Sequence, residues 1–412
     1  MKIVIIGNGI AGINTASVLS TNKDLSIEVY GDESYPFYSR IRLPDVLSGE
    51  VPPEAITFYK PDWYEKKGFS VHTSTVVSKI NREEKKILLD DGTEVSWDFL
   101  VIATGASCNH PPIEGSSAPG IFTLRTQDDV KAIRESIARN PESASVIGGG
   151  LLGLEAARAL KDAGVRLVRV LEIFPRLLPR QLDETGSALL QKRFTAMGIE
   201  VVCSAETSDF IIGAENGLPC NTIELKDGRS FLSGTTILSM GVHSNTDLAK
   251  NCGLSVKRGI CVNEFMQTTD PSIYAVGDCA EFGGIVWGII PAALEQAPVA
   301  AKHILSVIGY LEADQAPVYT QTVPKTALKV GDVELLSMGK AVLTPEEISS
   351  GAFDIMSRVW EDELRYEKYV IEKETEVLVG AIVYGSKLNQ SAIQKMSGKK
   401  IDRSELEVLL AN

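Results

Sequence analysis

The chain has 412 residues, a net charge of −13 and a globular composition in which 44% of the residues are hydrophobic. This length exceeds what one ordinary hydrophobic core serves and predicts two or three domains. The acidic balance argues against a nucleic-acid partner, because phosphate backbones bind basic surfaces.

The sequence gives no sign of a targeting segment, a membrane span or a metal site. The most apolar run, Gly283 to Leu294, is too short to cross a bilayer, and a strand that begins at Lys2 leaves no room for a leader. The six cysteines form no C-x-x-C pair and the four histidines are isolated, so neither a disulfide framework nor a metal site is expected. We expect a cytoplasmic protein.

The N-terminal stretch KIVIIGNGIAG predicts a buried parallel strand, a tight turn and the start of a helix. Gly7, Gly9 and Gly12 have the spacing G-x-G-x-x-G. The first glycine permits the turn, the second lets the backbone approach a pyrophosphate, and the third lets the helix pack closely on the strand. The N–H groups of the first helical residues, Ile10 and Ala11, would point at the same anion.

A second strand, Leu25 to Tyr30, is followed by Asp32, twenty residues after Gly12. An acid at this place is expected to hydrogen-bond a ribose hydroxyl. Because glycines also gather in plain turns, the glycine pattern alone is weak. With both strands, the helix and the acid in place, the sequence predicts a dinucleotide-binding fold.

Residues 32–49 form a polar and aromatic stretch that predicts a loop. Arg40 and Arg42 suit a loop that crosses a phosphate-bearing ligand. An ordinary surface loop with solvated arginines is the alternative, and the sequence leaves both open.

A later buried strand, Phe99 to Ile102, ends in Ala103, Thr104 and Gly105. These small residues would bring bare backbone against something flat or tightly packed. Small residues at a strand end are common, so this signal is weak by itself.

The glycine pattern occurs a second time. After a strand from Ala144 to Ile147, Gly148, Gly150 and Gly153 repeat the spacing, and a helix from Leu154 to Ala163 follows. Chance production of two complete copies is implausible, so the chain is expected to bind two dinucleotides.

The next strand, Arg166 to Leu171, ends at Glu172. A carboxylate at the ribose position would repel a 2′-phosphate, so the second site should prefer NADH to NADPH. Arg176 could soften that preference, and a glutamate that points idly at solvent is the alternative reading. The unit closes with a strand from Thr235 to Met240 and Gly241, again a buried strand that ends in glycine.

A buried strand from Ile273 to Val276 delivers Gly277 and Asp278 at its carboxyl end, where doubly wound sheets place their ligands. An aspartate there can accept hydrogen bonds from a ribityl chain, which NAD lacks, so a flavin is favoured over a plain helix cap. Cys279 reads as a small packing residue rather than a redox thiol. The apolar helix from Pro291 to Ile308 would aim its N-terminal dipole at the flavin.

The pattern changes after Pro317 to alternating strands and a terminal helix, roughly Asp402 to Leu410. We therefore expect an α/β chain with two Rossmann-like dinucleotide-binding domains and a small α+β C-terminal domain. The expected boundaries are 1–115 with 242–315 for the discontinuous FAD-binding domain, 116–241 for the inserted NAD-binding domain, and 316–412 for the C-terminal domain.

Four motifs in fixed order, the first glycine turn, ATG, GGGLLGLE and YAVGD, resemble the pyridine nucleotide–disulfide oxidoreductase superfamily. The stretches PRQLDETGSALL and GDCAEFGGIVWG, with the short C-terminal domain, look like NADH:rubredoxin oxidoreductases and the FAD-binding N-terminal part of NADH nitrite reductases. The likeness covers essentially the whole chain. It is specific for the fold and much less so for the electron acceptor.

The resemblance implies roles position by position. On the FAD side it implies Gly7, Gly9 and Gly12 at the pyrophosphate, Asp32 at the ribose, Val77 at the adenine, Thr104 and Gly105 at the flavin end, Asp278 at the ribityl chain, and Pro291 and Gln296 at the ring edge. Further candidate FAD-binding residues are Ile10, Ala11, Arg40, Ala103 and Gly277. On the NAD side it implies Gly148, Gly150, Leu151, Leu152 and Gly153 at the pyrophosphate, Glu172 at the ribose, Gly241 at the closing strand end, and Glu155 at the nicotinamide amide. Lys329 would approach the flavin from the C-terminal domain, and Glu155, Arg40 and Lys329 are the candidate catalytic residues.

One departure bears on the chemistry. Disulfide reductases and thiol peroxidases of this superfamily carry a redox cysteine facing the flavin, whereas Ser39 to Leu47 contains none. A thiolate relay therefore has no residue to use. The chain has no cysteine cluster for a siroheme or iron–sulfur module either.

We expect an FAD-dependent NADH oxidoreductase that passes electrons to a one-electron acceptor such as a rubredoxin or ferredoxin. Rubredoxins are typically acidic, so docking would need a local basic patch, for which Arg40 and Arg42 are candidates. The alternative is an NADH-coupling subunit of a larger metal-containing complex, like nitrite reductase or a tungsten aldehyde oxidoreductase. A non-catalytic flavin- and NAD-binding sensor is the alternative from another class.

Overall fold

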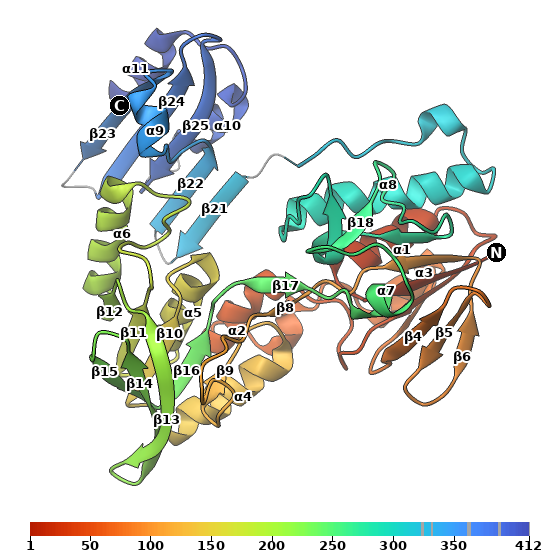
Figure 1. Ribbon diagram of the computed structural model, residues 1–412, viewed down its shortest axis with the longest axis horizontal. Coiled ribbons are helices and arrows are strands. Elements are labelled where there is room, and N and C mark those ends of the chain that lie inside the picture. Colours follow the sequence, from red (N-terminus) through yellow and green to blue (C-terminus); the bar gives the residue numbers. More distant parts are fainter. Residues whose placement is uncertain (323–324, 331–332, 361–363, 386–388, 412) are drawn as a thin grey trace. The chain divides into compact units, whose positions relative to one another are not determined.

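The computed structural model describes residues 1–322, 325–330, 333–360, 364–385 and 389–411, with the side chains of 325–330 and 333 outside the description. Contacts divide the chain into two compact units, drawn in Figure 1. Unit 1 comprises Met1–Arg42, Pro52–Asn109 and Gly241–Thr322, and unit 2 comprises Leu43–Val51, His110–Met240 and Val323–Asn412.

Unit 1 is built on a parallel five-stranded sheet with the order β19-β7-β1-β2-β3. Its strands are β1 (Lys2–Ile6), β2 (Ser26–Tyr30), β3 (Ser70–His72), β7 (Phe99–Ile102) and β19 (Ile273–Ala275). Strand β19 joins β7 although the whole of residues 110–240 lies between them in the sequence. The expected insertion of one dinucleotide fold into another is therefore confirmed.

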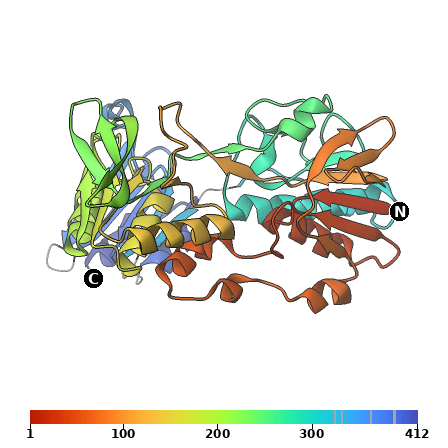
Figure 2. The same cartoon turned by 90° about the horizontal axis from the view of Figure 1, so that it is seen from below.

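Helices α1 (Ile10–Leu19) and α8 (Ile290–Val307) pack against each other on this sheet, as Figure 2 shows in red and teal. Strand β1 is buried on both faces, with Ile3, Val4 and Ile5 fully inaccessible, which explains its uninterrupted apolar sequence.

Smaller elements complete unit 1. A three-stranded antiparallel sheet has the order β4-β5-β6, and two strand pairs are β8 with β17 and β18 with β20. These strands are β4 (Val77–Asn81), β5 (Lys86–Leu89), β6 (Glu94–Ser96), β8 (Ala106–Cys108), β17 (Val242–Ser244), β18 (Ile260–Val262) and β20 (Ala280–Phe282). The helices are α3 (Pro61–Lys67) and α7 (Asp247–Asn251), with 3₁₀ turns η1 (Arg40–Arg42), η2 (Pro53–Ile56), η3 (Gly277–Cys279) and η4 (Ala313–Gln315).

Unit 2 repeats the same architecture with a parallel sheet of order β12-β11-β10-β16-β9. The strands are β9 (Ile121–Phe122), β10 (Ser143–Ile147), β11 (Leu167–Leu171), β12 (Ile199–Val202) and β16 (Thr235–Leu238), with helices α4 (Gln127–Arg139), α5 (Leu151–Asp162) and α6 (Glu184–Ala196). A second, antiparallel sheet holds β13 (Thr207–Glu215), β14 (Leu218–Leu225) and β15 (Ser230–Ser233). Strands β14 and β15 form a hairpin around Asp227, and β13 and β14 form a longer hairpin, drawn in green in Figure 2.

The C-terminal part of unit 2 is an antiparallel sheet of order β21-β22-β25-β24-β23. It contains β21 (Lys325–Val330), β22 (Val333–Gly339), β23 (Phe353–Trp360), β24 (Arg365–Glu372) and β25 (Val377–Tyr384), with α9 (Pro345–Ser349), α10 (Gln390–Met396) and α11 (Arg403–Ala411). Residues from α10 and α11 share one apolar core with this sheet, whereas α6 contacts β24. This sheet thus belongs to the same compact unit as residues 110–240. The three-domain boundaries given above remain our proposal.

The expected loop over residues 32–49 needs correction. It contains η1 and a short helix, α2 (Leu43–Ser48), which belongs to unit 2. Leu43, Val46 and Leu47 are buried at 2%, 1% and 0% exposure, so burial of a short apolar face outweighs the polar, proline-containing local sequence.

A buried ionic cluster fixes the C-terminal sheet to its helices. Glu367 is fully buried on β24 and accepts hydrogen bonds from Arg365, Tyr369 and Asn389, and Asn389 also donates to the Leu409 carbonyl. A buried carboxylate is tolerated only when its oxygens are satisfied in this way.

Replacing Glu367 by alanine should destabilise the protein strongly, because it leaves a buried guanidinium without its carboxylate. We expect a loss of about 3–5 kcal/mol in the free energy of unfolding, measured by denaturant titration. The matched control is Glu407→Ala on α11, whose carboxylate is largely exposed, and its loss should stay under about 1 kcal/mol. Equal losses for the two variants would contradict the account.

Candidate functional site

The first glycine turn joins β1 to α1 with almost no free space behind it. A Cβ on Gly7, whose φ is +111°, would lie 2.2 Å from the Ala103 carbonyl oxygen, and one on Gly12 would lie 2.0 Å from the Gly7 carbonyl oxygen. A Cβ on Gly9, in contrast, would meet no described atom within 4 Å. Gly7 and Gly12 therefore serve the packing, and Gly9 faces open space.

The second glycine turn, between β10 and α5, has the same construction. A Cβ on Gly148, with φ +113°, would lie 2.3 Å from the Ser239 carbonyl oxygen, and one on Gly153 would lie 2.0 Å from the Gly148 carbonyl oxygen. Gly150 again has no described atom within 4 Å of its would-be Cβ.

Both helices begin with open N–H groups. Gly9 caps α1 and Gly150 caps α5, and among the described residues no side chain hydrogen-bonds either helix start. The first N–H groups of a helix have no partner within the helix, and together with the dipole they favour an anion. Each turn, with the first N–H groups of its helix at Ile10 and Ala11 or at Leu151 and Leu152, is therefore suited to an anion such as a pyrophosphate, and we call the two turns the first and the second cradle.

Unit 1 brings the Y-A-V-G-D segment to the first cradle. A Cβ on Gly277 would lie 2.8 Å from the Ala11 side chain, and the Gly277 N–H donates to the Gln296 amide oxygen at 2.8 Å. The carboxyl end of β19, the start of α1 and the start of α8 thus converge. Asp278 is half-buried beside them. Pro291, which lies on α8 like Gln296, is exposed.

Thr104 and Gly105 are held by a residue that the sequence did not single out. The Thr104 hydroxyl donates to the Asn245 carbonyl at 2.7 Å, and the Asn245 side chain donates back to the Thr104 carbonyl at 2.9 Å. The Asn245 N–H also bonds the Gly105 carbonyl at 3.0 Å. Asn245 lies 141 positions after Thr104 in the chain, so no local sequence pattern marks it.

The two cradles differ at the residue that follows the second strand. In unit 2 this residue is Glu172, which is 5% exposed and accepts hydrogen bonds from the Gly149 N–H at 2.5 Å and the Phe174 N–H at 2.9 Å. In unit 1 the corresponding residue is Gly31, where a Cβ would lie 2.5 Å from the Asn8 side chain. Asp32 is one residue further along and exposed.

Other predicted positions on the FAD side lie near this corner. The backbone N–H groups of Ser74 and Thr75 bond the carbonyls of Glu33 and Gly31, which brings the start of β4 and Val77 close to Asp32. Arg40 is ion-paired with Glu33 and lies over the Tyr38 ring. Its charge is therefore largely neutralised, which weakens its candidacy for a basic patch.

Gly241 and Lys329 are two further predicted positions. Gly241 belongs to unit 1, where its carbonyl accepts the Asn109 N–H at 2.9 Å. Lys329 lies on β21, but its side chain is outside the described residues.

Residues 1–303 match the family model for pyridine nucleotide-disulphide oxidoreductase. The chain belongs to this family. It is 34% identical to the assimilatory nitrate reductase electron transfer subunit of Bacillus subtilis, over 93% of this chain and 47% of that protein. It is 33% identical to an NADH oxidase of Methanocaldococcus jannaschii, over 98% and 93% of the two chains. The crystal structure of NADH:rubredoxin oxidoreductase from Clostridium acetobutylicum superposes with a TM-score of 0.76 at 28% identity, over 100% and 99% of the chains.

The chain spans about half the length of the first three curated relatives it matches, at 47%, 48% and 44%. Proteins of the pyridine nucleotide-disulphide oxidoreductase family are enzymes that use FAD and NAD(P)H, so these are the cofactors that family membership implies for the chain. The residues fit these groups, because each unit has one open glycine position before an uncapped helix.

Glu155 has an unusual environment for a carboxyl group. It lies on α5 little more than one turn after Gly150, and α5 packs against α2, which carries Asp45. Burial, and secondarily the negative charge of Asp45, raises the pKa of Glu155 to about 7. The side chain therefore titrates near neutral pH.

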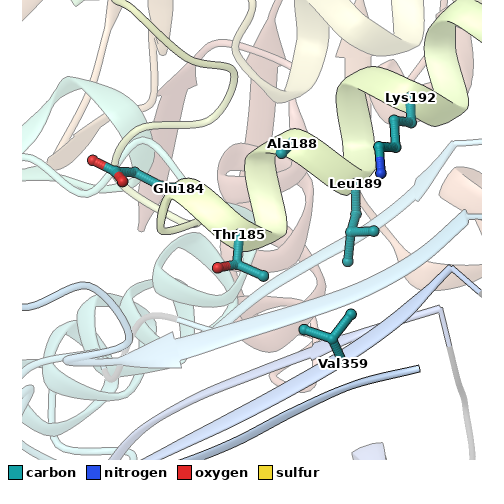
Figure 3. A pocket seen from close by; sticks show the side chains of 6 residues that line it. All are labelled: Glu184, Thr185, Ala188, Leu189, Lys192 and Val359. Carbon is teal, nitrogen blue, oxygen red and sulfur yellow. The ribbon is translucent and has the colours of Figure 1, made fainter. Parts of the chain in front are cut away.

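A hollow of about 390 Å³ lies elsewhere in unit 2 and includes none of the predicted site residues. Figure 3 shows Thr185 and Leu189 extending from α6 toward Val359 on β23. Its rim carries Glu184 and Lys192, of opposite charge. It is an open depression at the border of α6 and the C-terminal sheet.

Within the described part of the chain, none of the helices combines the length and hydropathy that crossing a bilayer requires. Over the same residues, no cluster of three or more potential ligand side chains is placed to hold a metal ion.

Replacing Gly150 by valine should leave the fold intact and weaken pyridine-nucleotide binding by roughly tenfold or more, because the added side chain enters only the space in front of α5. Calorimetric titration with NAD⁺ measures this, and flavin content should not change. Gly9→Val should lower the FAD content, because its side chain enters the space in front of α1, and should leave the second cradle unchanged.

Gly213→Ala on β13 is the control, since its Cβ would meet only the Cys220 carbonyl oxygen at an ordinary 4.0 Å. The assignment of two separate cradles fails if Gly9→Val and Gly150→Val impair the same cofactor.

Replacing Glu155 by glutamine should change the pH profile of stability. A carboxyl whose pKa is raised on folding contributes stability that is complete below its unfolded pKa and is lost as the pH rises through the folded value of about 7. Between pH 5 and 8 the variant should gain about 2–3 kcal/mol relative to wild type, seen as a rising difference in melting temperature. The exposed Glu135→Gln on α4 is the control, and a flat difference for Glu155→Gln would contradict the raised pKa.

Proposed function

We propose that this chain takes electrons from NADH through FAD and passes them one at a time to a small redox protein of the rubredoxin or ferredoxin type. The observation that carries the proposal is the pair of glycine cradles built alike in the two units, each with an open position before an uncapped helix. FAD, when bound, supplies the step from the two-electron donor NADH to one-electron transfer.

The residues have separate tasks in this proposal. The first cradle binds the FAD pyrophosphate, Asp32 faces its ribose, and Asp278 accepts hydrogen bonds from the ribityl chain. Thr104, held by Asn245, presents backbone to the flavin end. The task of these groups is to position the cofactor, because hydride transfer between bound rings needs orientation rather than an acid or base.

The second cradle binds the pyrophosphate of NADH in this proposal, and Glu172 selects NADH through its ribose. Its two oxygens are already oriented by the N–H groups of Gly149 and Phe174, so the carboxylate is fixed before the nucleotide arrives. A 2′-phosphate would meet this buried negative charge, which favours NADH over NADPH. Glu155 is proposed to contact the nicotinamide amide.

Support for a protein acceptor comes from the sequence and the relatives. The segment 39–47 has no cysteine, so a thiol relay is not part of the proposal. One relative that matches along nearly its whole length is named an NADH-rubredoxin oxidoreductase, and two others are named for a ferredoxin and for rubredoxin. We also propose that the chain is located in the cytoplasm.

A second candidate is supported by the length comparison. The first three curated relatives are an electron transfer subunit of nitrate reductase and two nitrite reductases, and each is about twice as long as the matched part. The chain would then couple NADH to a metal-containing partner subunit.

Anaerobic stopped-flow mixing with NADH tests the core of the proposal. The visible absorbance of the bound flavin should bleach in a phase that saturates with NADH, and NADPH should need much higher concentrations. A flavin that stays oxidised at saturating NADH would refute the function.

The acceptor is then identified by comparing rates of reduction of a rubredoxin, a ferredoxin and ferricyanide at several ionic strengths. A rubredoxin or ferredoxin reduced faster than ferricyanide supports the small-protein acceptor. Slow reduction of both proteins, together with stable co-purification of a metal-containing subunit, favours the second candidate.

A further inference from the structure

Residues 173–182 form a bridge inside unit 2 between the second glycine cradle and the C-terminal sheet. The segment starts directly after Glu172 and ends at Asp183, the N-cap of α6. Each of its ends is fixed by side-chain and backbone contacts to a different part of the unit. We refer to it as the bridge segment.

The N-terminal part of the bridge segment contacts the second cradle. Glu172 bonds the Phe174 N–H at 2.9 Å, and the Leu178 N–H donates to the Gly149 carbonyl at 3.3 Å. The Leu177 side chain is fully buried against Gly149, where a Cβ would approach it to 2.6 Å. Ile173 and Phe174 are each 54% exposed beside the ribose carboxylate.

The middle of the bridge segment is strained. Leu178 has φ +48°, in the left-handed region that leucine rarely occupies. Such a conformation persists only when the surroundings over-determine it. Leu178 is 1% exposed, and its carbonyl accepts the N–H groups of Gln181 and Leu182 at 2.9 and 2.8 Å.

The C-terminal end of the bridge segment is bonded to the C-terminal sheet. The Ser337 hydroxyl on β22 donates to the Gln181 carbonyl at 2.7 Å. The Asp183 carboxylate accepts hydrogen bonds from the Tyr366 hydroxyl at 2.7 Å and the Lys368 ammonium at 2.9 Å, both on β24. Its other oxygen caps α6 at the Gly186 N–H, 3.0 Å away.

These anchors are shielded from water. Lys368 is 7% exposed and Tyr366 4% exposed, unlike an ordinary surface ion pair. Burial alone would raise the pKa of Asp183, but the hydrogen bonds from Tyr366 and Gly186 and the charge of Lys368 outweigh it and lower that pKa below its ordinary value. Removal of the ammonium therefore leaves a half-buried carboxylate without its counter-charge.

We propose that Lys368 and Tyr366 of the C-terminal sheet are positioning residues for pyridine-nucleotide binding, acting through Asp183 and the bridge segment on the second cradle. The inference rests on the proposed binding of NADH at that cradle. The C-terminal sheet then holds the segment that flanks Glu172, the carboxylate proposed to contact the nucleotide's ribose.

The test compares Lys368→Met, Lys368→Arg and Asp183→Asn in the full chain with FAD bound. Asparagine keeps the Oδ1 cap of α6 and replaces the oxygen that accepts from Tyr366 and Lys368 by an amide NH2 group, which separates the two tasks of Asp183. Lys368→Met and Asp183→Asn should raise the KM for NADH and the calorimetric Kd for NAD⁺ by roughly tenfold, with kcat toward ferricyanide within about twofold. Lys368→Arg should keep a near-wild-type Kd.

The control is Lys340→Met, which removes another lysine of the C-terminal part, one that is exposed and paired with Glu347. It should leave KM and Kd unchanged. A Lys368→Met protein that melts at a lower temperature but binds NAD⁺ like wild type would overturn the proposal, as would a fall in kcat at constant KM. If Lys368→Met does not fold, the Kd of Asp183→Asn decides in the same way.

The outcome is separable from that of the proposed function. Wild type that binds NAD⁺ while its flavin is not bleached by NADH refutes the function and still lets the Kd series decide this inference. Wild type that binds no pyridine nucleotide overturns both.

Discussion

The close approach of a strand, a glycine turn and a helix is the constraint on which both units depend. At Gly12 and Gly153 a single methyl group would lie 2.0 Å from a carbonyl oxygen of the same turn, so the helix can sit at this distance only without a side chain. This packing directs the free N–H groups at the start of α1 and α5 into the open space beside Gly9 and Gly150. The anion site thus arises from the close packing of helix on strand, because this packing leaves the first N–H groups of the helix exposed.

Features of this kind are local, and the sequence predicted them well. In each unit the glycine spacing, the flanking apolar strands and the acid near the end of the second strand (Asp32 or Glu172) are close together in the sequence, and their repetition made chance implausible. The insertion of one dinucleotide fold in the other followed from the order of the motifs, and the pairing of β19 with β7 confirms it. Family membership was likewise recognisable from four motifs in order.

Features that depend on contacts between distant residues were missed. Asn245 holds Thr104 from 141 positions away, and neither residue's neighbours signal the pair. Helix α2 forms in a stretch of polar and proline-containing sequence because three apolar side chains find a buried surface. The contacts of Tyr366 and Lys368 on β24 with Asp183, which lies 183 and 185 positions earlier in the chain, are likewise marked by no local pattern.

The two cradles also show how one backbone arrangement is adapted to different ligands. Between the first two glycines of the turn stands Asn8 in unit 1 and Gly149 in unit 2, and after the second strand stands Gly31 in unit 1 and Glu172 in unit 2. There is room for one polar side chain between these two positions: Asn8 fills it from the turn, and Glu172 fills it from the strand. Only the second arrangement places a negative charge at the cradle itself. We therefore expect unit 2 to select an unphosphorylated ribose. In unit 1 the acid available for a ribose contact is the exposed Asp32, one residue after Gly31.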